Sequence, residues 1–374
     1  MVKILFSFGT RPEAIKLAPL IKELQSRDRF DVRVLITAQH REMLDQVLDL
    51  FELKPDIDLN LMRPDQSLEE LTARIIESIG EVLRKEKPDA VILQGDTTTS
   101  FVTALAAYYQ QIPVIHVEAG LRTNQKYSPF PEEINRRLTG VLADFHFPPT
   151  QKAMDALLRE NVSQDIVFPV GNTVIDALLW VVEKARAKDE EFSKKFPMIL
   201  KEGRMLLVTG HRRESFGQGF LNICSALKQI AGSNPDLQIV YPVHLNPNVQ
   251  KPVREILSDI PNVHLIQPQD YLTFVWLLDR CHLVLTDSGG VQEEAPTLGR
   301  PVLVMRDTTE RPEGIDAGVA ELVGTDPEKI VAGVQRLLDD EETYKRMSRA
   351  QNPYGDGTSS RQIADILETR LTAE

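Results

Sequence analysis

The sequence has 374 residues, and its 43 Lys and Arg against 55 Asp and Glu give a formal net charge of −12. This charge argues against nonspecific nucleic-acid binding and against a polybasic membrane contact. The length and the 42% of hydrophobic residues suffice for two domains with a core each. No run reaches the roughly 18 apolar residues that span a bilayer.

The first apolar run and the cysteines indicate the compartment. Residues 4–8 are apolar except for Ser7, and Gly9 and Pro12 end the run before it reaches the length of a signal-peptide core, so we expect a first strand there. The two cysteines, Cys224 and Cys281, cannot build a disulfide framework. We therefore expect a cytoplasmic protein.

From the N-terminus, strand-like apolar runs alternate with amphipathic segments of helical period. The runs lie at 2–8, 32–38, 90–94 and 113–117, and the helical segments lie at 12–27, 41–50, 68–86 and 100–111. Such alternation is typical of a parallel sheet that right-handed crossover helices cover on both faces. Residues 145–148 and 166–170 continue the pattern.

A polar, charge-dense stretch at 184–204 interrupts the pattern, and a second series follows. Its strand-like runs lie at 205–210, 237–243, 263–268, 283–287 and 301–305. The sequence therefore predicts an α/β protein of two doubly wound Rossmann-like domains, with a linker near 170–204 and a ligand cleft between the domains. A last amphipathic helix is expected at 358–374.

Two carboxylates follow buried strands of the first series. Asp96 comes just after the run 90–94, and Glu118 comes directly after 113–117. The carboxyl edge of an open parallel sheet is where ligands bind. Two acids at this edge suggest proton chemistry.

Two strand-to-helix junctions have the features of phosphate sites. Gly9-Thr-Arg11-Pro-Glu places Arg11 at a helix start with Lys16 one turn on, although an ordinary turn with solvated charges would look the same. Ser288 with Gly289 and Gly290 opens a second helix. Glycines there allow close approach of a phosphate, whereas the alternative is a capped helix with an acidic first turn.

Basic residues gather after other strands. His211, Arg212 and Arg213 follow the first strand of the second series, and arginine suits phosphate oxygens. Arg136 lies four residues after Glu132, a spacing that also fits a surface pair on one helix. Arg311 follows the run 301–305 and could equally be a solvated loop charge.

Some fingerprints are missing from the sequence. It contains neither GxxxxGK[ST] nor a GxGxxG that follows a strand, so we expect no bound nicotinamide cofactor and no P-loop site. The seven histidines lack zinc-type spacing, so no metal is expected. The phosphate sites then suit a nucleotide diphosphate that serves as a handle on a substrate.

Taken together, the motifs closely resemble the non-hydrolysing UDP-N-acetylglucosamine 2-epimerases of bacteria. The segments that carry the resemblance are FGTRPEAIKLAPL, TAQHREMLDQVL, QGDTTTS, HVEAGLRT, SPFPEEINR, GNTVIDAL, VTGHRRESFG, YPVHLNP, TDSGGVQEEAP, PVLVMRDTTERPE and NPYGDG. They occur in order over nearly the whole chain. The resemblance implies a glycosyltransferase-B-like fold, a C-terminal helix that returns to the first domain, and a homodimer. The expected domains are then 1–169 with 358–374, and 170–357.

The resemblance also implies the reaction and the residues that serve it. UDP-GlcNAc and UDP-ManNAc would be interconverted by elimination of UDP to 2-acetamidoglucal and re-addition, to supply ManNAc units for surface polysaccharide. The implied catalytic residues are Asp96, Glu118, Glu132, His211 and Arg136. The implied substrate-binding residues are Arg11, Lys16, Arg212, Phe274, Ser288, Gly289, Gly290, Glu294 and Arg311. A second, activating UDP-GlcNAc site, which some members have, would use Gln39, Glu42, Arg212 and His244.

Three other functions stay open. A hydrolysing epimerase would release free ManNAc and UDP, a sugar transferase on the same fold would need an acceptor, and a nucleotide-sugar sensor would bind without turnover. The sequence has no amphipathic or basic patch for a lipid-linked acceptor. All three candidate carboxylates are present, which disfavours a sensor.

Overall fold

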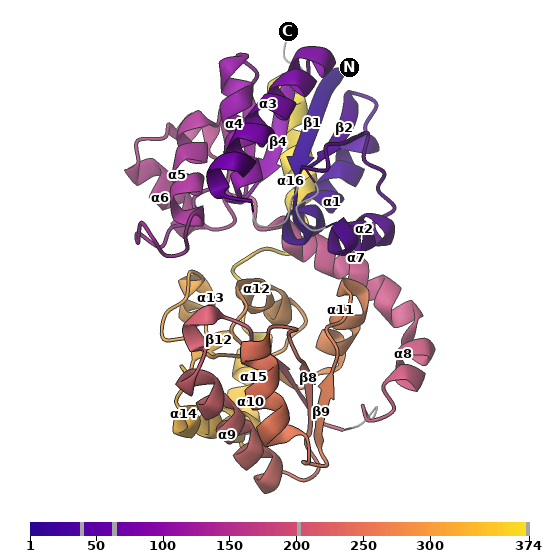
Figure 1. The fold of residues 1–374 in the computed structure, drawn as a ribbon, viewed down its shortest axis with the longest axis vertical. Helices are drawn as coiled ribbons and strands as arrows, with labels where there is room; N and C mark the ends of the chain where they lie inside the picture. Colours follow the sequence, from indigo (N-terminus) through magenta and orange to yellow (C-terminus); the bar gives the residue numbers. More distant parts are fainter. Residues whose placement is uncertain (38–40, 62–65, 200–202, 372–374) are drawn as a thin grey trace. The chain divides into compact units, whose positions relative to one another are not determined.

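The computed structural model describes residues 1–37, 41–61, 66–199 and 203–371. The chain forms two compact units (Figure 1). Unit 1 comprises Met1–Ala177 with Tyr354–Glu374, and unit 2 comprises Leu178–Pro353. The sequence pattern placed these divisions at 169/170 and 357/358.

Unit 1 contains a six-stranded parallel sheet in the order β3-β2-β1-β4-β5-β6. Its strands are β1 (Val2–Phe8), β2 (Phe30–Ile36), β3 (Ile57–Asp58), β4 (Ala90–Gln94), β5 (Val114–Val117) and β6 (Phe145–Phe147). Every residue of β4 and β5 is buried. Strands this apolar and β-branched are typical of a parallel sheet with both faces covered.

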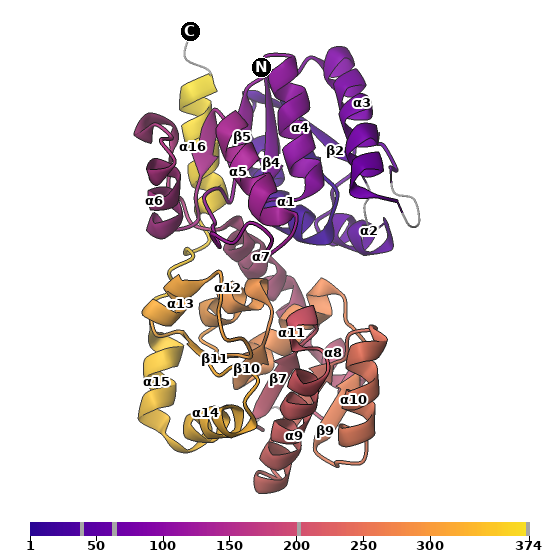
Figure 2. The same cartoon turned by 60° about the vertical axis from the view of Figure 1, so that its left-hand side comes forward.

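The helices of unit 1 form two layers on the sheet. They are α1 (Arg11–Gln25), α2 (Arg41–Leu50), α3 (Leu68–Glu86), α4 (Thr98–Tyr109), α5 (Glu132–Leu142), α6 (Gln151–Arg159) and α16 (Ser359–Leu371), with a 3-10 turn η1 (Gln164–Ile166). α4 packs between α3 and α5, whereas α1 packs with α2 and α16. Figure 2 shows α3 and α4 side by side, and the aliphatic side chains of these helices and of β4 make up one core.

The last helix of the chain belongs to unit 1. In Figure 1 the yellow α16 lies among the indigo elements that begin the chain, and it packs on α1. Arg27, just after α1, places its guanidinium nitrogens 2.7 Å from Asp365 Oδ1 and 2.8 Å from Glu368 Oε2. The expected return of the C-terminal helix to the first domain is confirmed.

Unit 2 repeats the same plan. Its parallel sheet has the order β12-β11-β10-β7-β8-β9. The strands are β7 (Met205–Thr209), β8 (Gln238–Pro242), β9 (Val263–Ile266), β10 (Leu283–Thr286), β11 (Val302–Val304) and β12 (Ala320–Leu322). Counted from β7, this is the strand order of unit 1, so both halves are doubly wound. The predicted α/β, glycosyltransferase-B-like class is confirmed.

The helices of unit 2 cover its sheet in the same way. They are α8 (Asp189–Lys195), α9 (Gln218–Ser233), α10 (Pro247–Leu257), α11 (Tyr271–Arg280), α12 (Gly289–Thr297), α13 (Pro312–Asp316), α14 (Pro327–Asp339) and α15 (Glu341–Arg349), with a 3-10 turn η2 (Arg213–Ser215). α9 packs against α10 and α14 over one core, whereas α11 packs against α8 and β7.

The charge-dense stretch that the sequence suggested as a linker is mostly helical. α7 (Thr173–Ala187) carries the chain from unit 1 into unit 2, and α8 follows it. Phe192 and Phe196 pack on Trp276, and their ring centroids lie 5.4 Å and 5.8 Å, respectively, from the Trp276 ring centroid. The Trp276 indole N–H donates to Asp189 Oδ1 at 3.0 Å. Phe192 and Phe196 therefore anchor the charge-dense stretch, whose composition had suggested a solvated linker.

Candidate functional site

The motif loops lie where the strand order reverses in each sheet. β1 and β4 are neighbours in unit 1 and end before Gly9 and Gly95, whereas β7 and β10 are neighbours in unit 2 and end before Gly210 and Asp287. At such a point the connections leave in opposite directions, so the carboxyl edge stays open for a ligand. Each unit therefore has a switch-point site of its own.

A buried carboxylate, Glu13, joins the two switch-point loops of unit 1. It accepts hydrogen bonds from Thr10 N at 2.8 Å and Thr10 Oγ1 at 2.6 Å on one loop, and from Thr97 Oγ1 at 2.7 Å and Ser100 Oγ at 3.0 Å on the other. Burial raises the pKa of Glu13, and the hydrogen bonds from Thr10 and Thr97 oppose the rise. This residue holds the loop of Arg11 against the loop of Asp96.

The second carboxylate predicted at a strand end, Glu118, is buried and held by three donors. Lys16 Nζ lies 2.6 and 2.7 Å from its two oxygens, Asn172 Nδ2 donates to Oε1 at 2.8 Å, and Gln94 Nε2 donates to Oε2. The side chains of Lys16 and Glu118 are only 13% and 4% exposed. The structure thus brings these two predicted residues into a buried ion pair at the carboxyl edge.

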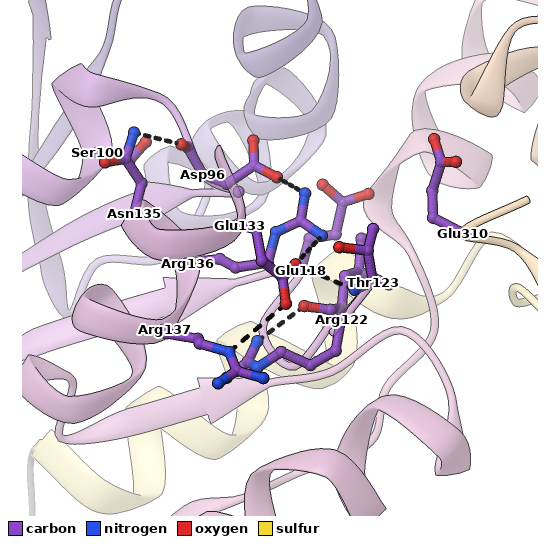
Figure 3. Close-up of polar contacts among 12 residues, drawn as sticks. Asp96, Ser100, Glu118, Arg122, Thr123, Glu133, Asn135, Arg136, Arg137 and Glu310 are labelled. Atoms are coloured by element: carbon purple, nitrogen blue, oxygen red, sulfur yellow. Dashed lines mark hydrogen bonds and ion pairs between the residues drawn. The ribbon is translucent and has the colours of Figure 1, made fainter. Parts of the chain in front are cut away.

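Asp96 lies at the end of a chain of charges that starts in the loop after β5 (Figure 3). The backbone N–H groups of Thr123 and Asn124 donate to the buried Glu133 at 3.0 Å each, and Arg136 Nη1 donates to Glu133 Oε2 at 3.2 Å. The other end of the Arg136 guanidinium binds Asp96. The buried Arg136 is therefore oriented by Glu133 and contacts Asp96, so it is more than a solvated surface charge.

Arg11 and Glu132 are each the first residue of a helix, α1 and α5 respectively, and both are half-buried. A helix start carries partial positive charge, which favours the Glu132 carboxylate there. Glu132 and Arg136 are one turn apart on α5, so both project from the same helix face towards the edge that carries Asp96.

In unit 2, the buried Asp287 orders the basic loop after β7. Asp287 Oδ2 accepts from the backbone N–H groups of His211 at 2.7 Å and Arg212 at 2.8 Å, and His211 Nδ1 lies 3.3 Å from Oδ1. Burial raises the pKa of Asp287, but the hydrogen bonds and charge of His211 outweigh it, so the pKa is below its ordinary value. An ionised Asp287 thus orients the His211 ring.

The glycine-rich junction begins α12, as the sequence predicts. Ser288 is the N-cap, and Gly289 is the first helical residue. Arg311 reaches this helix, since its Nε lies 2.7 Å from Glu293 Oε1. An ideal Cβ at Gly289 would lie 3.2 Å from Arg311 Cζ, so a larger residue there would press on that guanidinium.

Glu294 and Phe274 come from neighbouring helices of unit 2. Glu294 is buried in α12 and accepts from Tyr271 Oη of α11 at 2.6 Å. Phe274 is half-buried one turn further along α11. An ideal Cβ at Gly290 would lie 3.9 Å from Glu294 Oε2.

The residues expected for a second site are described only in part. Gln39 lies outside the described residues, and so does the side chain of Glu42. The His244 ring stacks on His211 with centroids 5.4 Å apart at 17°. His244 thus adjoins the loop that carries Arg212.

Metal clusters and membrane-spanning helices are both absent from the described residues. No group of three or more His, Cys, Asp and Glu side chains in that part of the chain could hold a metal ion. None of its helices is both long and apolar enough to cross a membrane.

Comparison with known proteins decides the family. The sequence model described as UDP-N-acetylglucosamine 2-epimerase matches residues 22–368. The chain belongs to the UDP-N-acetylglucosamine 2-epimerase family. It is 58% identical to the UDP-N-acetylglucosamine 2-epimerase of Salmonella typhimurium over 371 residues, which cover 98% of this chain and 99% of that protein.

Solved structures of family members have the same fold. The crystal structure of UDP-GlcNAc 2-epimerase from Neisseria meningitidis bound to UDP-GlcNAc matches with a TM-score of 0.94 at 51% identity, over 99% of this chain and 100% of that one. The Methanocaldococcus jannaschii enzyme in complex with UDP-GlcNAc and UDP matches with a TM-score of 0.83 at 35% identity, over 98% and 100%.

The buried carboxylates that hold these loops are not among the site residues that the sequence predicts. Glu13 had a local signal, because it stands three residues after Thr10 in the spacing of a capping box. Asp287 had a signal too, since it follows β10 directly. Glu133 had none that sequence spacing could reveal, because it accepts from the backbone N–H groups of Thr123 and Asn124 in the loop after β5.

Proposed function

We propose that this chain interconverts UDP-GlcNAc and UDP-ManNAc. The family and the names of its relatives support this substrate. The observation that carries the proposal is the pair of cation–carboxylate contacts, Lys16 with Glu118 and Arg136 with Asp96, at the carboxyl edge beside the switch point of unit 1. Together with the arginines near the start of α12, they supply proton-transfer groups and an anion site.

The reaction explains why both the proton-transfer groups and the anion site are required. The proton on C2 of the sugar is not α to a carbonyl, so removal by a base alone is too slow. We propose that a base takes the C2 proton while the C1–O bond breaks, which leaves a C1=C2 double bond in 2-acetamidoglucal and releases UDP. Attack of the UDP oxygen on C1 with protonation of C2 on the other face gives the epimer. These two reaction steps are redox-neutral overall and use no cofactor.

Asp96, Glu118 and Glu132 are the proposed acid and base groups. Positioned side chains of this kind contribute about 10²–10⁴-fold to such steps. The Asp96 side chain is 26% exposed, so solvent reaches it, whereas Glu118 is enclosed by its donors. Arg136 and Lys16 stabilise the ionised carboxylates, and Arg11 supplies positive charge at the start of α1.

Unit 2 is proposed to hold the leaving group. Positive charge and preorganised donors aimed at the departing diphosphate lower the barrier for its release. In this assignment the diphosphate binds Ser288 and the N–H groups of Gly289 and Gly290, together with Arg212 and Arg311. His211, oriented by Asp287, stabilises the charge that develops on the leaving oxygen. Glu294 accepts from the ribose hydroxyls, and Phe274 lies against the uracil.

We further propose a homodimer that feeds ManNAc units to surface polysaccharide, with the Gln39, Glu42, Arg212 and His244 segments as a second UDP-GlcNAc site. Exposed apolar side chains support the dimer. Tyr108 and Tyr109 end α4, and Val141 lies near the end of the adjacent α5 with 81% of its surface exposed. A partner subunit would cover these side chains in the proposed dimer.

One experiment tests the reaction. The protein is incubated with UDP-GlcNAc alone in D2O, and the sugar is followed by NMR. UDP-ManNAc with deuterium at C2 is the expected product. Free ManNAc would indicate a hydrolysing enzyme, no turnover until an acceptor is added would indicate a transferase, and binding without turnover would indicate a sensor. Any of these three outcomes contradicts the proposal.

A further inference from the structure

A carboxylate of the protein itself lies among the arginines of the proposed diphosphate site. Glu310 Oε1 lies 3.1 Å from Arg311 Nη1 and 3.3 Å from Arg212 Nη2, and Oε2 lies 2.6 Å from Arg306 Nη1. Arg212 comes from the loop after β7, whereas the other two flank Glu310 in the segment after β11. One carboxylate thus neutralises guanidinium groups from two segments.

The same carboxylate lies against the start of α12. An ideal Cβ at Gly289 would be 3.1 Å from Glu310 Oε1. The exposed N–H groups and the dipole of a helix start favour an anion at this point. Glu310 therefore sits where both the helix and the arginines would hold a phosphate oxygen.

The charges around Glu310 keep it ionised. Burial raises its pKa, but Arg311, Arg306 and Arg212 outweigh burial and hold the pKa at about 2. The side chain is 12% exposed, so this negative charge is largely removed from water. At neutral pH the Glu310 carboxylate is therefore an anion, and the site holds this negative charge before UDP binds.

The neighbouring ion pairs would survive the departure of Glu310. Arg306 keeps Glu214, whose Oε1 lies 2.7 Å from its Nε, and Arg311 keeps Glu293. Arg212 has no second carboxylate partner in the part of the chain that the structure describes. Arg212 is thus the guanidinium that gains most from a phosphate in place of Glu310.

We propose that Glu310 is an internal substitute for a phosphate group of UDP, which neutralises Arg212 and Arg311 in the empty site and is displaced when the nucleotide binds. This inference rests on the proposed function, because it requires UDP to bind at this site. A diphosphate brings more charge and more acceptor oxygens than one carboxylate, so it wins the exchange. The exchange nevertheless weakens UDP binding, because the contacts of Glu310 are lost first.

A positioning role for Glu310 predicts the opposite change in UDP affinity. If Glu310 instead stayed in place to aim the arginines at the ligand, its removal would weaken UDP binding. The sign of the affinity change in Glu310→Gln therefore decides between the two roles. Uridine, which lacks phosphate, reports any general damage to the site.

The test is isothermal titration of the full chain with UDP and with uridine. We expect Glu310→Gln to bind UDP about tenfold more tightly than the wild-type protein, which corresponds to about 1.4 kcal/mol, and to bind uridine within twofold. Glu214→Gln is the matched control, because it removes the other carboxylate of Arg306 and leaves Glu310. It should leave UDP affinity within twofold.

Glu310→Asp guards against a folding failure of the glutamine variant. It keeps the negative charge but withdraws it from the arginines, so we expect UDP affinity between the wild-type and glutamine values. Weaker or unchanged UDP binding in a folded variant overturns the inference while leaving the proposed function intact. If the wild-type protein binds no UDP at all, the proposed function fails with it.

Discussion

Replacing Glu118 with glutamine leaves the Lys16 ammonium buried beside a neutral amide. In the wild-type protein Lys16 Nζ lies 2.6 Å from Glu118 Oε1, and both side chains are largely removed from water. Removing one partner of a buried ion pair costs about 3–5 kcal/mol. Lys16 retains some exposure, so we expect the lower end, about 3 kcal/mol. In a domain of the size of unit 1, that lowers the melting temperature by about 6–12 °C.

The double variant Lys16→Met/Glu118→Gln separates stability from catalysis. Replacing both partners of a buried pair is often close to neutral, so we expect it to unfold within about 1 kcal/mol of the wild-type protein. Turnover should nevertheless stay at least about 10²-fold low in both variants, because the proposed acid or base is absent. Stability would thus recover while activity does not.

Calorimetry is the appropriate assay. Both tryptophans, Trp180 and Trp276, lie in unit 2, so their fluorescence does not report directly on unit 1. The reasoning is refuted if Glu118→Gln costs less than about 1 kcal/mol, or if the double variant costs the sum of the two single ones. Wild-type turnover in either Glu118 variant would remove this residue from the mechanism.

Four further outcomes are expected. Asp96→Asn should lower kcat by about 10²-fold or more with little change in melting temperature, since the buried Arg136 keeps its contact with Glu133; wild-type kinetics would exclude Asp96 as acid or base. Gly289→Ala should weaken UDP binding about tenfold in a titration, because its Cβ would lie 3.2 Å from Arg311 Cζ and take up space that the phosphate needs between the helix start and this arginine; an unchanged affinity would place the phosphate elsewhere. Val141→Glu should convert a dimer to a monomer in light scattering, because it puts a charge at an exposed apolar position of the proposed interface; a variant that stays dimeric would move the interface. His116 has a pKa of about 3, lowered first by burial and then by the charge of His146, from an ordinary 6.5. As pH falls from 6.5 the unfolded chain therefore binds a proton at His116 that the folded one does not, so His116 alone should account for about 2 kcal/mol of the stability lost between pH 7.5 and 5. In urea unfolding, the drop for His116→Gln should be smaller than the wild-type drop by about this amount, and an equal drop would contradict the assignment.

The fold was predictable because strand and helix signals are local. The run 90–94 coincides with β4, and 41–50 and 68–86 coincide with α2 and α3. The position of Asp96 and Glu118 at strand ends followed from the same runs. α7 and α8 were not predictable in this way, because their packing depends on distant contacts such as Phe192 on Trp276. Charge density at 184–204 concealed the few apolar residues that fix the segment.

The candidate site was predictable only as a set of residue types at loop positions. Strand-end logic indicated Asp96 and Glu118, and the family resemblance added Glu132. Neither indication could show that Lys16 pairs with Glu118 or that Arg136 contacts Asp96. Such contacts join residues about 40 to 100 positions apart. Spacing along one helix carries no information on them.

The docking of α16 on α1 determines when unit 1 can complete its fold during synthesis. The ion pairs of Arg27 with Asp365 and Glu368 join the beginning of the chain to its end. All of Leu178–Pro353 must be made between them, which takes roughly 10–35 s at about 5–20 residues per second. During that interval the face of α1 that α16 covers is open to the ribosome's surroundings. A circular permutant that begins with α16 and continues into β1 would close this face first and would make unit 1 a contiguous, separately expressible domain.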